Sequence, residues 1–427
     1  SPAVSDGVVY FGSADKHLYA VDTKTGEEKW KFQAGDNVYS PVVLGGVVYC
    51  GSDDSHLYAL DIKTGEEKWK FETGGMVNSS PTVLAGVVYF GSGNWGINHL
   101  YALDTKTGEE KWKFETGDSI ESSPIISEGV VYFGSNDNHL YALDVKTGKE
   151  KWKFETGGWI ESSPNISEGV VYFGSEDNHL YALDVKTGEE KWKFETGDII
   201  YSSPTVLNGV VYYGAVDHSL DGYLYALDAK TGEEKWKFKT GDRVESSPAL
   251  VDGVVYFGSL DSHLYAVDIK TGKEKWKFEA GDSVYSPAVA DGVVYFGSYD
   301  NHLYAIDIQI ALELYKKHTK EEKQTEQKKQ LEEKEKLKKL KEWEDEKKSN
   351  WNPEKEKNLK KIRELMVSSQ FDAGIELAQT VDDPYLLLEL VDGCKIEEDG
   401  TITLNETFDI NAAEEDYDIL VSALFKI

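Results

Sequence analysis

Short apolar runs separated by turn residues repeat along the first 308 residues at intervals of about 40 residues. One copy contains four such runs, at residues 120–126, 129–135, 139–145 and 150–156. The second run is almost wholly apolar, and Gly, Asn and Asp stand between the runs. So many β-branched residues and glycines exclude a helical repeat, and each unit is predicted to form four short strands buried on both faces.

Eight copies of this unit predict a closed ring of sheets. The string Gly-Val-Val-Tyr-Phe-Gly-Ser, or a close variant, begins at Gly7, Gly46, Gly86, Gly129, Gly169, Gly209, Gly253 and Gly292. Four strands per unit indicate an eight-bladed β-propeller of four-stranded antiparallel blades over residues 1–308. In the fourth unit we expect Asp144 to accept hydrogen bonds from the amides that follow it, and Gly148 to supply a positive φ.

The two ends of the predicted ring differ from its interior. Ser1-Pro2 aligns with the middle of the first strand of the other units, which suggests that the chain has been trimmed. After Asp307 the last unit reads Ile-Gln-Ile-Ala-Leu-Glu-Leu-Tyr, where the others read Ile-Lys-Thr-Gly-Glu-Glu-Lys-Trp or similar. We expect its outer strand to come either from Ile308 to Tyr315 or from a removed N-terminal segment, and the sequence leaves both possibilities open.

Charge and composition narrow the classes of partner. The net charge is −31, and residues 1–309 hold 26 basic and 48 acidic side chains, so nucleic acid is excluded and a cationic or neutral partner is favoured. No apolar run is long enough to span a bilayer. Cys50 and Cys394 are too far apart in sequence for a dense disulfide framework. A cytoplasmic location is weakly favoured, with an extracytoplasmic one open if a signal peptide was removed.

A motif in each repeat resembles that of a known family. Ala20–Trp30 reads Ala-Val-Asp-Thr-Lys-Thr-Gly-Glu-Glu-Lys-Trp, and this stretch and its copies, such as Ala142–Trp152, resemble the A-x-D-x-x-T-G-x-x-x-W docking motif of PQQ-like (quinoprotein-type) propellers. The resemblance covers residues 1 to about 308. It implies that each motif tryptophan packs against the neighbouring blade near the motif glycine. The tryptophans are Trp30, Trp69, Trp112, Trp152, Trp192, Trp236 and Trp276.

The same resemblance raises the question of catalysis. Family members that oxidise alcohols and sugars bind pyrroloquinoline quinone and calcium, and some carry a disulfide between adjacent cysteines. This chain has no adjacent cysteines and lacks the insertions that lengthen those enzymes. No Gly-x-Ser-x-Gly elbow, P-loop or zinc motif occurs. We therefore predict no enzyme, catalytic residue, cofactor or metal, with a degenerate quinoprotein binding Ca²⁺ or the quinone in the central channel as the alternative.

Two recurrent polar positions could be taken for metal ligands. A histidine precedes Leu-Tyr-Ala in seven units, with Tyr223 in the sixth, and we expect it to support a hydrogen bond between the Asp-x-His turn and a neighbouring strand. These histidines are His17, His56, His99, His139, His179, His263 and His302. Near the start of the innermost strand, carboxylates could bind Ca²⁺ or line a solvated pore. The position holds Tyr39, Asn78, Glu121, Glu161, Tyr201, Glu245 and Tyr285.

Two other positions vary while the rest of the unit is copied, and they predict the binding face. One enters the inner strand and the other follows the second strand, so antiparallel geometry should bring both to one face. Both insertions, residues 94–98 and 217–222, fall in the second of these loops. The predicted ligand-binding residues are Asn37, Met76, Ser119, Trp159, Ile199, Arg243, Ser283, Asp53, Trp95, Asn136, Glu176, Leu260 and Tyr299. Loops on a rigid scaffold commonly carry binding sites, although unconstrained drift would also produce variation.

The C-terminal third is predicted to hold two further parts. Residues 309–352 are rich in Lys and Glu and indicate a solvated helical spacer from Leu312 to about Lys348. Residues 353–427 indicate a small acidic domain, mostly α-helical, with helices near 359–379, 384–393 and 414–427 and a hairpin around Asp399-Gly400. The chain is predicted to be a monomeric recognition module for a protein or glycan, with a scaffold that uses the propeller rim as a rival function.

Overall fold

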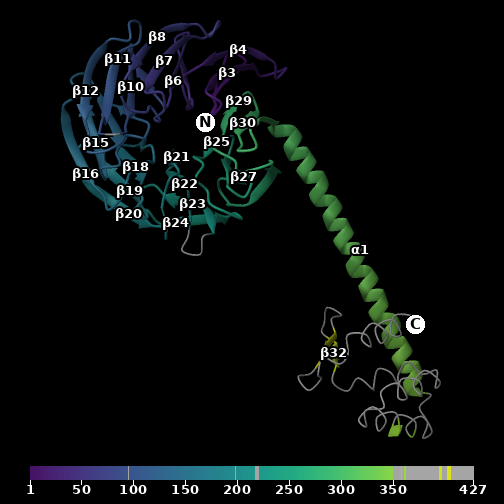
Figure 1. Cartoon of the computed structure of the whole chain (residues 1–427). Coiled ribbons are helices and arrows are strands. Elements are labelled where there is room, and N and C mark those ends of the chain that lie inside the picture. Colours follow the sequence, from purple (N-terminus) through teal and green to yellow (C-terminus); the bar gives the residue numbers. More distant parts are fainter. Residues whose placement is uncertain are drawn as a thin grey trace. The chain divides into compact units, whose positions relative to one another are not determined.

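The computed structural model describes residues 1–349 except 95, 198 and 217–220, together with residues 357, 360, 361, 394–396 and 402–404. The chain divides into two compact units, Ser1–His318 and Thr319–Ile427. In the first unit, eight antiparallel sheets are arranged as a ring of blades (Figure 1). The predicted eight-bladed propeller is therefore confirmed.

Each blade is a meander in which consecutive strands pair, from a short innermost strand to an outer strand. The innermost strands are β1 (Ala3–Ser5), β5 (Val42–Leu44), β9 (Thr82–Leu84), β13 (Ile125–Ser127), β17 (Asn165–Ser167), β21 (Thr205–Leu207), β25 (Ala249–Val251) and β29 (Ala288–Ala290). The second strands are β2 (Val8–Gly12), β6 (Val47–Gly51), β10 (Val87–Ser92), β14 (Val130–Gly134), β18 (Val170–Gly174), β22 (Val210–Val216), β26 (Val254–Gly258) and β30 (Val293–Gly297).

The other two strands complete each blade toward the rim. The third strands are β3 (His17–Asp22), β7 (His56–Asp61), β11 (His99–Asp104), β15 (His139–Asp144), β19 (His179–Asp184), β23 (Gly222–Asp228), β27 (His263–Asp268) and β31 (Leu303–Asp307). The outer strands are β4 (Glu28–Gln33), β8 (Glu67–Glu72), β12 (Glu110–Glu115), β16 (Glu150–Glu155), β20 (Glu190–Glu195), β24 (Glu234–Lys239) and β28 (Glu274–Glu279).

The turns of the fourth blade behave as the sequence predicts. Asp144 Oδ1 accepts hydrogen bonds from the amides of Lys146 (3.2 Å) and Thr147 (3.0 Å), and Gly148 has φ 66°. The innermost strand is shorter than predicted, because β13 begins only at Ile125 rather than at residue 120. Pro124 has no N–H to donate, so it cannot continue a ladder toward the chain's N-terminal side.

Serine residues just before the innermost strand form the hydrogen bonds there. Ser122 Oγ accepts a hydrogen bond from the Gly134 amide of the same blade (3.0 Å), and the Ser123 amide donates to Ser163 Oγ of the next blade (2.9 Å). The second contact recurs from Ser163 to Ser203 and from Ser203 to Ser247. Hydroxyls therefore join neighbouring blades in place of a backbone ladder.

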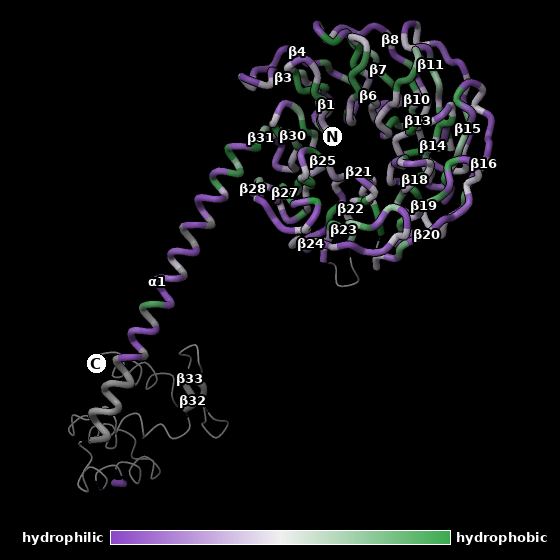
Figure 2. The backbone as a smooth tube through the Cα atoms, turned by 180° about the vertical axis from the view of Figure 1, so that it is seen from behind, coloured by the Kyte–Doolittle hydropathy of each residue, from purple (hydrophilic) through white to green (hydrophobic). Residues whose placement is uncertain are grey.

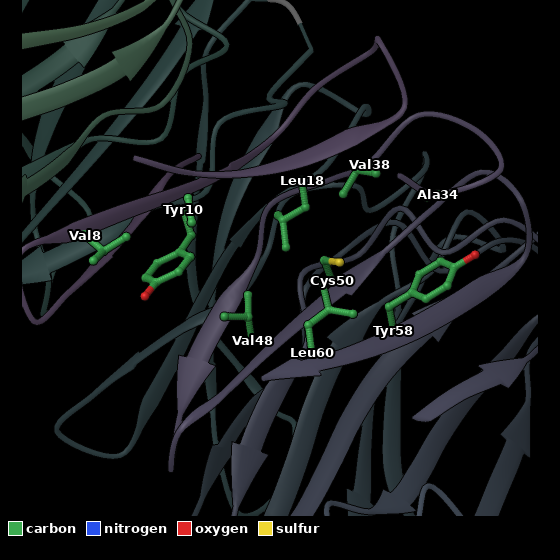
Figure 3. Packing of buried hydrophobic residues seen from close by; sticks show 10 residues of the cluster. Val8, Tyr10, Leu18, Ala34, Val38, Val48, Cys50, Tyr58 and Leu60 are labelled. Carbon is green, nitrogen blue, oxygen red and sulfur yellow. The ribbon is translucent and has the colours of Figure 1, made fainter. Parts of the chain in front are cut away.

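The hydrophobic core lies between blades rather than within one of them. Val8, Tyr10 and Leu18 of the first blade meet Val48, Cys50 and Leu60 of the second (Figure 3). Equivalent clusters fill the other closed junctions, while hydrophilic residues follow the outer rim (Figure 2). Blades with a closed junction on both sides bury both faces of their sheets, which explains why the second strand is an unbroken apolar run.

The motif tryptophans lie at six of these junctions. Trp112 Nε1 donates to the Val145 carbonyl of the next blade (3.2 Å), and a Cβ added to Gly148 would lie 2.6 Å from the Trp112 ring. The same contact joins each of the following pairs: Trp30 and Gly65, Trp69 and Gly108, Trp152 and Gly188, Trp192 and Gly232, Trp236 and Gly272. Glycine is needed here because the indole occupies the space of a side chain.

The eighth blade has three strands, β29 to β31, and the helix α1 (Ile308–Ser349) follows it directly. The expectation that Ile308 to Tyr315 could form the outer strand is therefore wrong. Asp307 Oδ1 accepts hydrogen bonds from the amides of Gln309 and Ile310, both at 2.9 Å, and so caps the helix. The helix begins four residues before the predicted Leu312.

The first turns of α1 cover the seventh blade. Ile308, Ala311, Leu312 and Tyr315 pack against the cluster that contains Trp276, which is 2% exposed. Tyr315 also donates a hydrogen bond to Glu274 Oε1 (2.7 Å). The helix thus shields the one motif tryptophan that has no glycine turn facing it, and residues 308–318 belong to the propeller unit.

In the second unit, the described strands β32 (Cys394–Ile396) and β33 (Ile402–Leu404) pair antiparallel, which confirms the predicted hairpin around Asp399-Gly400. The helices expected at 359–379, 384–393 and 414–427 lie outside the described residues, and the boundaries at 308 and 352 stay predictions. None of the helices in the described ranges is long and apolar enough to cross a bilayer.

Candidate binding face

The two variable positions meet at one face of the ring in the second, third, fourth, fifth, seventh and eighth blades. The Asp53 amide donates to the Asn37 carbonyl at 3.1 Å, and the Glu176 amide donates to the Trp159 carbonyl at 2.9 Å. The same bond joins Gly93 to Met76, Asn136 to Ser119, Leu260 to Arg243, and Tyr299 to Ser283. The predicted juxtaposition of these loops is confirmed, and we call this surface the variable face.

The predicted ligand-binding residues of the variable face differ in exposure and form three groups: exposed, buried and half-buried. Trp159 is 48% exposed, Tyr299 is 65% exposed, and Arg243 is also exposed. Asn136, by contrast, is only 7% exposed. The half-buried members are Asn37, Asp53, Met76, Ser119, Glu176, Ile199, Leu260 and Ser283. Met76 and Ile199 are therefore less exposed than expected, and Trp95 lies outside the described residues.

The Asp-x-His turns next to this face link neighbouring blades through aspartate. In the fourth blade, Asp137 Oδ2 accepts hydrogen bonds from the Gly117 amide of the preceding blade (2.8 Å) and from Tyr141 (2.7 Å). His139 Nδ1 lies 2.9 Å from the Asp137 carbonyl oxygen and so stays within the turn. The turn is bonded to the neighbouring blade, but the partner is Gly117 in the connection after β12 rather than a strand residue, the aspartate makes the bond, and the histidine shapes the turn.

Carboxylates from several blades gather beside the variable face, toward the centre of the ring. Asn136 forms hydrogen bonds to Glu121 and Glu161, and Tyr201 donates one to Glu176. In the second blade, Asp53 Oδ2 accepts from Tyr39 and from Asn37, both at 3.0 Å. Residues in the loops after the second strands thus form hydrogen bonds with residues at the inner-strand position. Both sets therefore belong to one polar network.

Burial and mutual repulsion control the charge of this network. Desolvation, followed by repulsion from Glu121 and Glu176, raises the pKa of Glu161 to about 7. Burial likewise raises the pKa of Glu121, Glu176 and Glu245, and for Glu245 the nearby Arg243 opposes that rise. A raised pKa in these carboxylates means that burial, with repulsion from neighbouring carboxylates, disfavours the negative form. The site would therefore gain from a cationic ligand.

The side chains do not fit the calcium site that a quinone-binding propeller would need. Within the described ranges, no group of three or more His, Cys, Asp and Glu side chains is placed to hold a metal ion. Asn136 already holds Glu121 and Glu161, and Cys50 is a buried free thiol. No chemical step through a metal or quinone is derived from this arrangement.

The sequence predicts the inner-strand residues to be metal ligands or pore lining, and they are not among the predicted ligand-binding residues. Tyr39, Glu121, Glu161, Tyr201 and Glu245 contact or electrostatically influence the predicted loop residues. The sequence carries a signal for them, because the inner-strand position holds Tyr, Asn or Glu in different blades. Polar residues near a ring centre also interact with solvent, so this variation does not by itself indicate binding.

Comparisons with known proteins agree on the repeat. Residues 1–113, 97–216 and 220–333 match a family model described as outer membrane protein assembly factor BamB. No curated protein matches the chain by sequence.

Solved structures share the fold. BamB from Moraxella catarrhalis superposes with a TM-score of 0.62 at 20% identity, covering 71% of this chain and 95% of that one. The computationally designed Ika8 protein gives 0.64 at 19% identity, covering 72% and 95%. Quinohemoprotein alcohol dehydrogenase from Comamonas testosteroni gives 0.58 at 18%, covering 69% of each chain. At these identities the likeness establishes the fold alone.

Proposed function

Because the chain belongs to the PQQ-like repeat family described as outer membrane protein assembly factor BamB, we propose that it is a non-enzymatic module that recognises a protein partner. The variable face receives a cationic segment of that partner. The family description supports a protein rather than a glycan ligand. The observation that carries the proposal is the set of under-compensated carboxylates at Glu121, Glu161, Glu176 and Glu245, flanked by exposed aromatic residues.

The aromatic residues supply the contact area that the carboxylates lack. Trp159 and Tyr299 expose large amphipathic rings, and such rings are frequent energetic anchors of protein interfaces. Tyr299 is held by an edge-on contact with Tyr285, at 4.8 Å between ring centroids, so its position is preset. A partner with lysine or arginine beside an apolar side chain would meet both features.

The first experiment is a pull-down from the source organism with the full chain and with the double variant Trp159→Ala/Tyr299→Ala. We expect the captured protein to be lost at least tenfold in the variant, since truncated anchors cost about 2 kcal/mol or more. The matched control is Leu44→Ala/Leu84→Ala/Leu207→Ala. These leucines are also exposed, at 50%, 45% and 37%, but end innermost strands on the opposite face. A partner lost equally in both variants would refute the assignment.

The charge component predicts a pH dependence. Glu161 is ionised above a pKa of about 7, so affinity for the captured cationic partner should rise roughly threefold to tenfold from pH 6 to pH 8. Titration calorimetry should show that Glu161→Gln flattens this rise.

The pH dependence of folding has the opposite sign. Between pH 4.5 and 7 the native state holds a proton on Glu161 that the unfolded chain has lost, so stability falls as pH rises from about 4.5 to 7. Affinity that is independent of pH would exclude Glu161 from the binding face.

A further inference from the structure

Three buried oxygen atoms of the polar network beside the variable face have no hydrogen-bond partner among the described residues. They are Asp53 Oδ1, Asn78 Oδ1 and Asn136 Oδ1. They come from the second, third and fourth blades, one from each. A buried acceptor without a donor is costly, because folding has removed its hydrogen bonds to water. We call these three residues the oxygen cluster.

The hydrogen bonds of adjacent atoms show what the oxygen cluster can bind. Asp53 Oδ2 already accepts two hydrogen bonds, both at 3.0 Å, so Oδ1 alone is left. Asn136, which is 7% exposed, is bonded to Glu121 and Glu161. Carboxylates accept, so the amide nitrogen of Asn136 donates both bonds and its Oδ1 stays an acceptor. The cluster therefore requires a ligand that donates hydrogen bonds.

Electrostatic contacts bring the three blades of the oxygen cluster together. Burial, followed by the charge and hydrogen bond of Asp53 and then by the charge of Glu121, raises the pKa of Tyr39. Tyr39 and Asp53 belong to the second blade, and Glu121 belongs to the fourth. Asn78 occupies the equivalent inner-strand position of the third blade, between them. Because Asn136 is bonded to Glu121, side chains of all three blades gather in one arc of the ring.

The negative charge of this arc is not balanced within the network. Burial, followed by repulsion from three other carboxylates, raises the pKa of Glu121. In the seventh blade, by contrast, the largest influence on the pKa of Glu245 after burial is attraction by Arg243. The chain thus supplies its own cation at the seventh blade, whereas the charges that act on Glu121 are negative. A cation from outside is therefore favoured at the second to fourth blades.

The arrangement of acceptors favours an ammonium group over other cations. In the described part of the chain, no three His, Cys, Asp and Glu side chains are placed to hold a metal ion. A guanidinium binds a carboxylate best through both of its oxygens, but Asp53 has only one oxygen left. A primary ammonium has three N–H donors and no acceptor, which matches three single oxygens.

We propose that a lysine side chain of the protein partner enters the ring from the variable face and donates its three N–H groups to the oxygen cluster. The inference rests on the proposed function and names the cation that this face receives. Asp53 lies in the loop after β6 and is half-buried, so it connects the cluster to that face. The long apolar stem of lysine lets its ammonium group reach a recessed acceptor while the backbone stays outside.

The first test compares blocked pentapeptides by titration calorimetry with the full chain at pH 8. The peptides are Gly-Leu-Lys-Leu-Gly and its counterparts with trimethyllysine or arginine in place of lysine. We expect saturable binding of the lysine peptide and at least fivefold weaker binding of the other two. Trimethyllysine keeps the positive charge but has no N–H group, so it separates hydrogen bonding from general attraction to an acidic surface. Free n-butylammonium should also bind at least fivefold more weakly than the lysine peptide.

Two variants each remove one acceptor of the oxygen cluster. In Asp53→Asn the amide oxygen takes over the bonds of Oδ2, so an N–H group replaces Oδ1 and repels the ammonium. Asn78→Leu removes an oxygen at similar volume. Each variant should bind the lysine peptide at least tenfold more weakly. The matched control, Glu128→Gln, removes a carboxylate of the fourth blade at an exposed turn on the opposite face and should leave affinity unchanged.

Several outcomes would overturn the proposal, with thermal unfolding used to verify that each variant is folded. These are equal affinity for the lysine and trimethyllysine peptides, and unchanged affinity in Asp53→Asn. Saturable Ca²⁺ binding that Asp53→Asn abolishes would assign the oxygen cluster to a metal instead. Binding of n-butylammonium as tight as that of the lysine peptide would assign it to a free amine.

The pull-down distinguishes this inference from the proposed function. A partner that is lost with Trp159→Ala/Tyr299→Ala but retained by Asp53→Asn and Asn78→Leu would leave the proposed function standing and overturn the lysine site. Binding of the lysine peptide without any partner captured at the variable face would support the site and refute the proposed function.

Discussion

The junction between the third and fourth blades and the junction between the eighth and first are built from the same residue types but are not equally filled. In the former, Phe133 is fully buried between Phe114 and Tyr141. In the latter, the ring contact described for Phe11 is with Tyr19 of the same blade, at 5.2 Å, and Phe11 stays half-buried. The comparison shows that a propeller blade is completed by its neighbour, because apolar side chains of two consecutive repeats line each closed junction.

The largest expected difference in stability comes from truncating a phenylalanine, because this side chain is buried to different extents in the two junctions. Phe133→Ala should lower the free energy of unfolding by about 3–5 kcal/mol, through lost transfer energy and a residual cavity. Phe11→Ala should cost only about 1–2 kcal/mol, because water already reaches the ring. Urea denaturation followed by far-UV circular dichroism measures both. Equal losses would mean that the eighth junction is as tightly packed as the others.

A smaller difference is expected at the motif glycines. Gly148 and Gly26 have φ 66° and 72°, so an added methyl group strains both backbones by about 1 kcal/mol. At Gly148 the methyl group also overlaps the Trp112 ring, which should add about 1–3 kcal/mol. The melting temperature of Gly148→Ala should therefore be well below that of Gly26→Ala. If the two variants melt together, something fills the space over Gly26.

The smallest expected loss of stability concerns a tyrosine hydrogen bond that both junctions contain. Tyr132→Phe removes the hydrogen bond to the Val185 carbonyl (3.0 Å), and Tyr295→Phe removes the bond to Thr23. Each should cost about 1 kcal/mol. A loss at Tyr132 without any loss at Tyr295 would show that the eighth junction is open at its centre as well as at its rim.

Most of the propeller could be read from the sequence because the repeat is nearly exact. Glycine and aspartate turns fix hairpins locally, and the spacing of Gly129 from Gly169 sets one blade after another. The start of α1 could not be foreseen, since Ile308 to Tyr315 is apolar enough for a strand and its helical state depends on packing against Trp276. Tertiary contacts decided between two local possibilities.

The candidate site was only partly predictable. Position and pairing of the variable loops follow from antiparallel geometry, but burial does not. Asn136 was expected to face a ligand, and instead it is buried and holds Glu121 and Glu161. Two residues far apart in sequence must converge before their charges interact, so the raised pKa of Glu161 has no signature in a single repeat.

The hairpin of β22 and β23 shows how this scaffold accommodates an insertion between its second and third strands. Its pairing runs from Val210 opposite Asp228 to Val216 opposite Gly222, two residue pairs farther than in the fourth blade, without disturbing the register toward the outer strand. A hairpin that lengthens outward is a natural graft point for protein engineering. Epitopes or binding loops inserted there could be displayed at defined positions around the ring while the junctions stay intact.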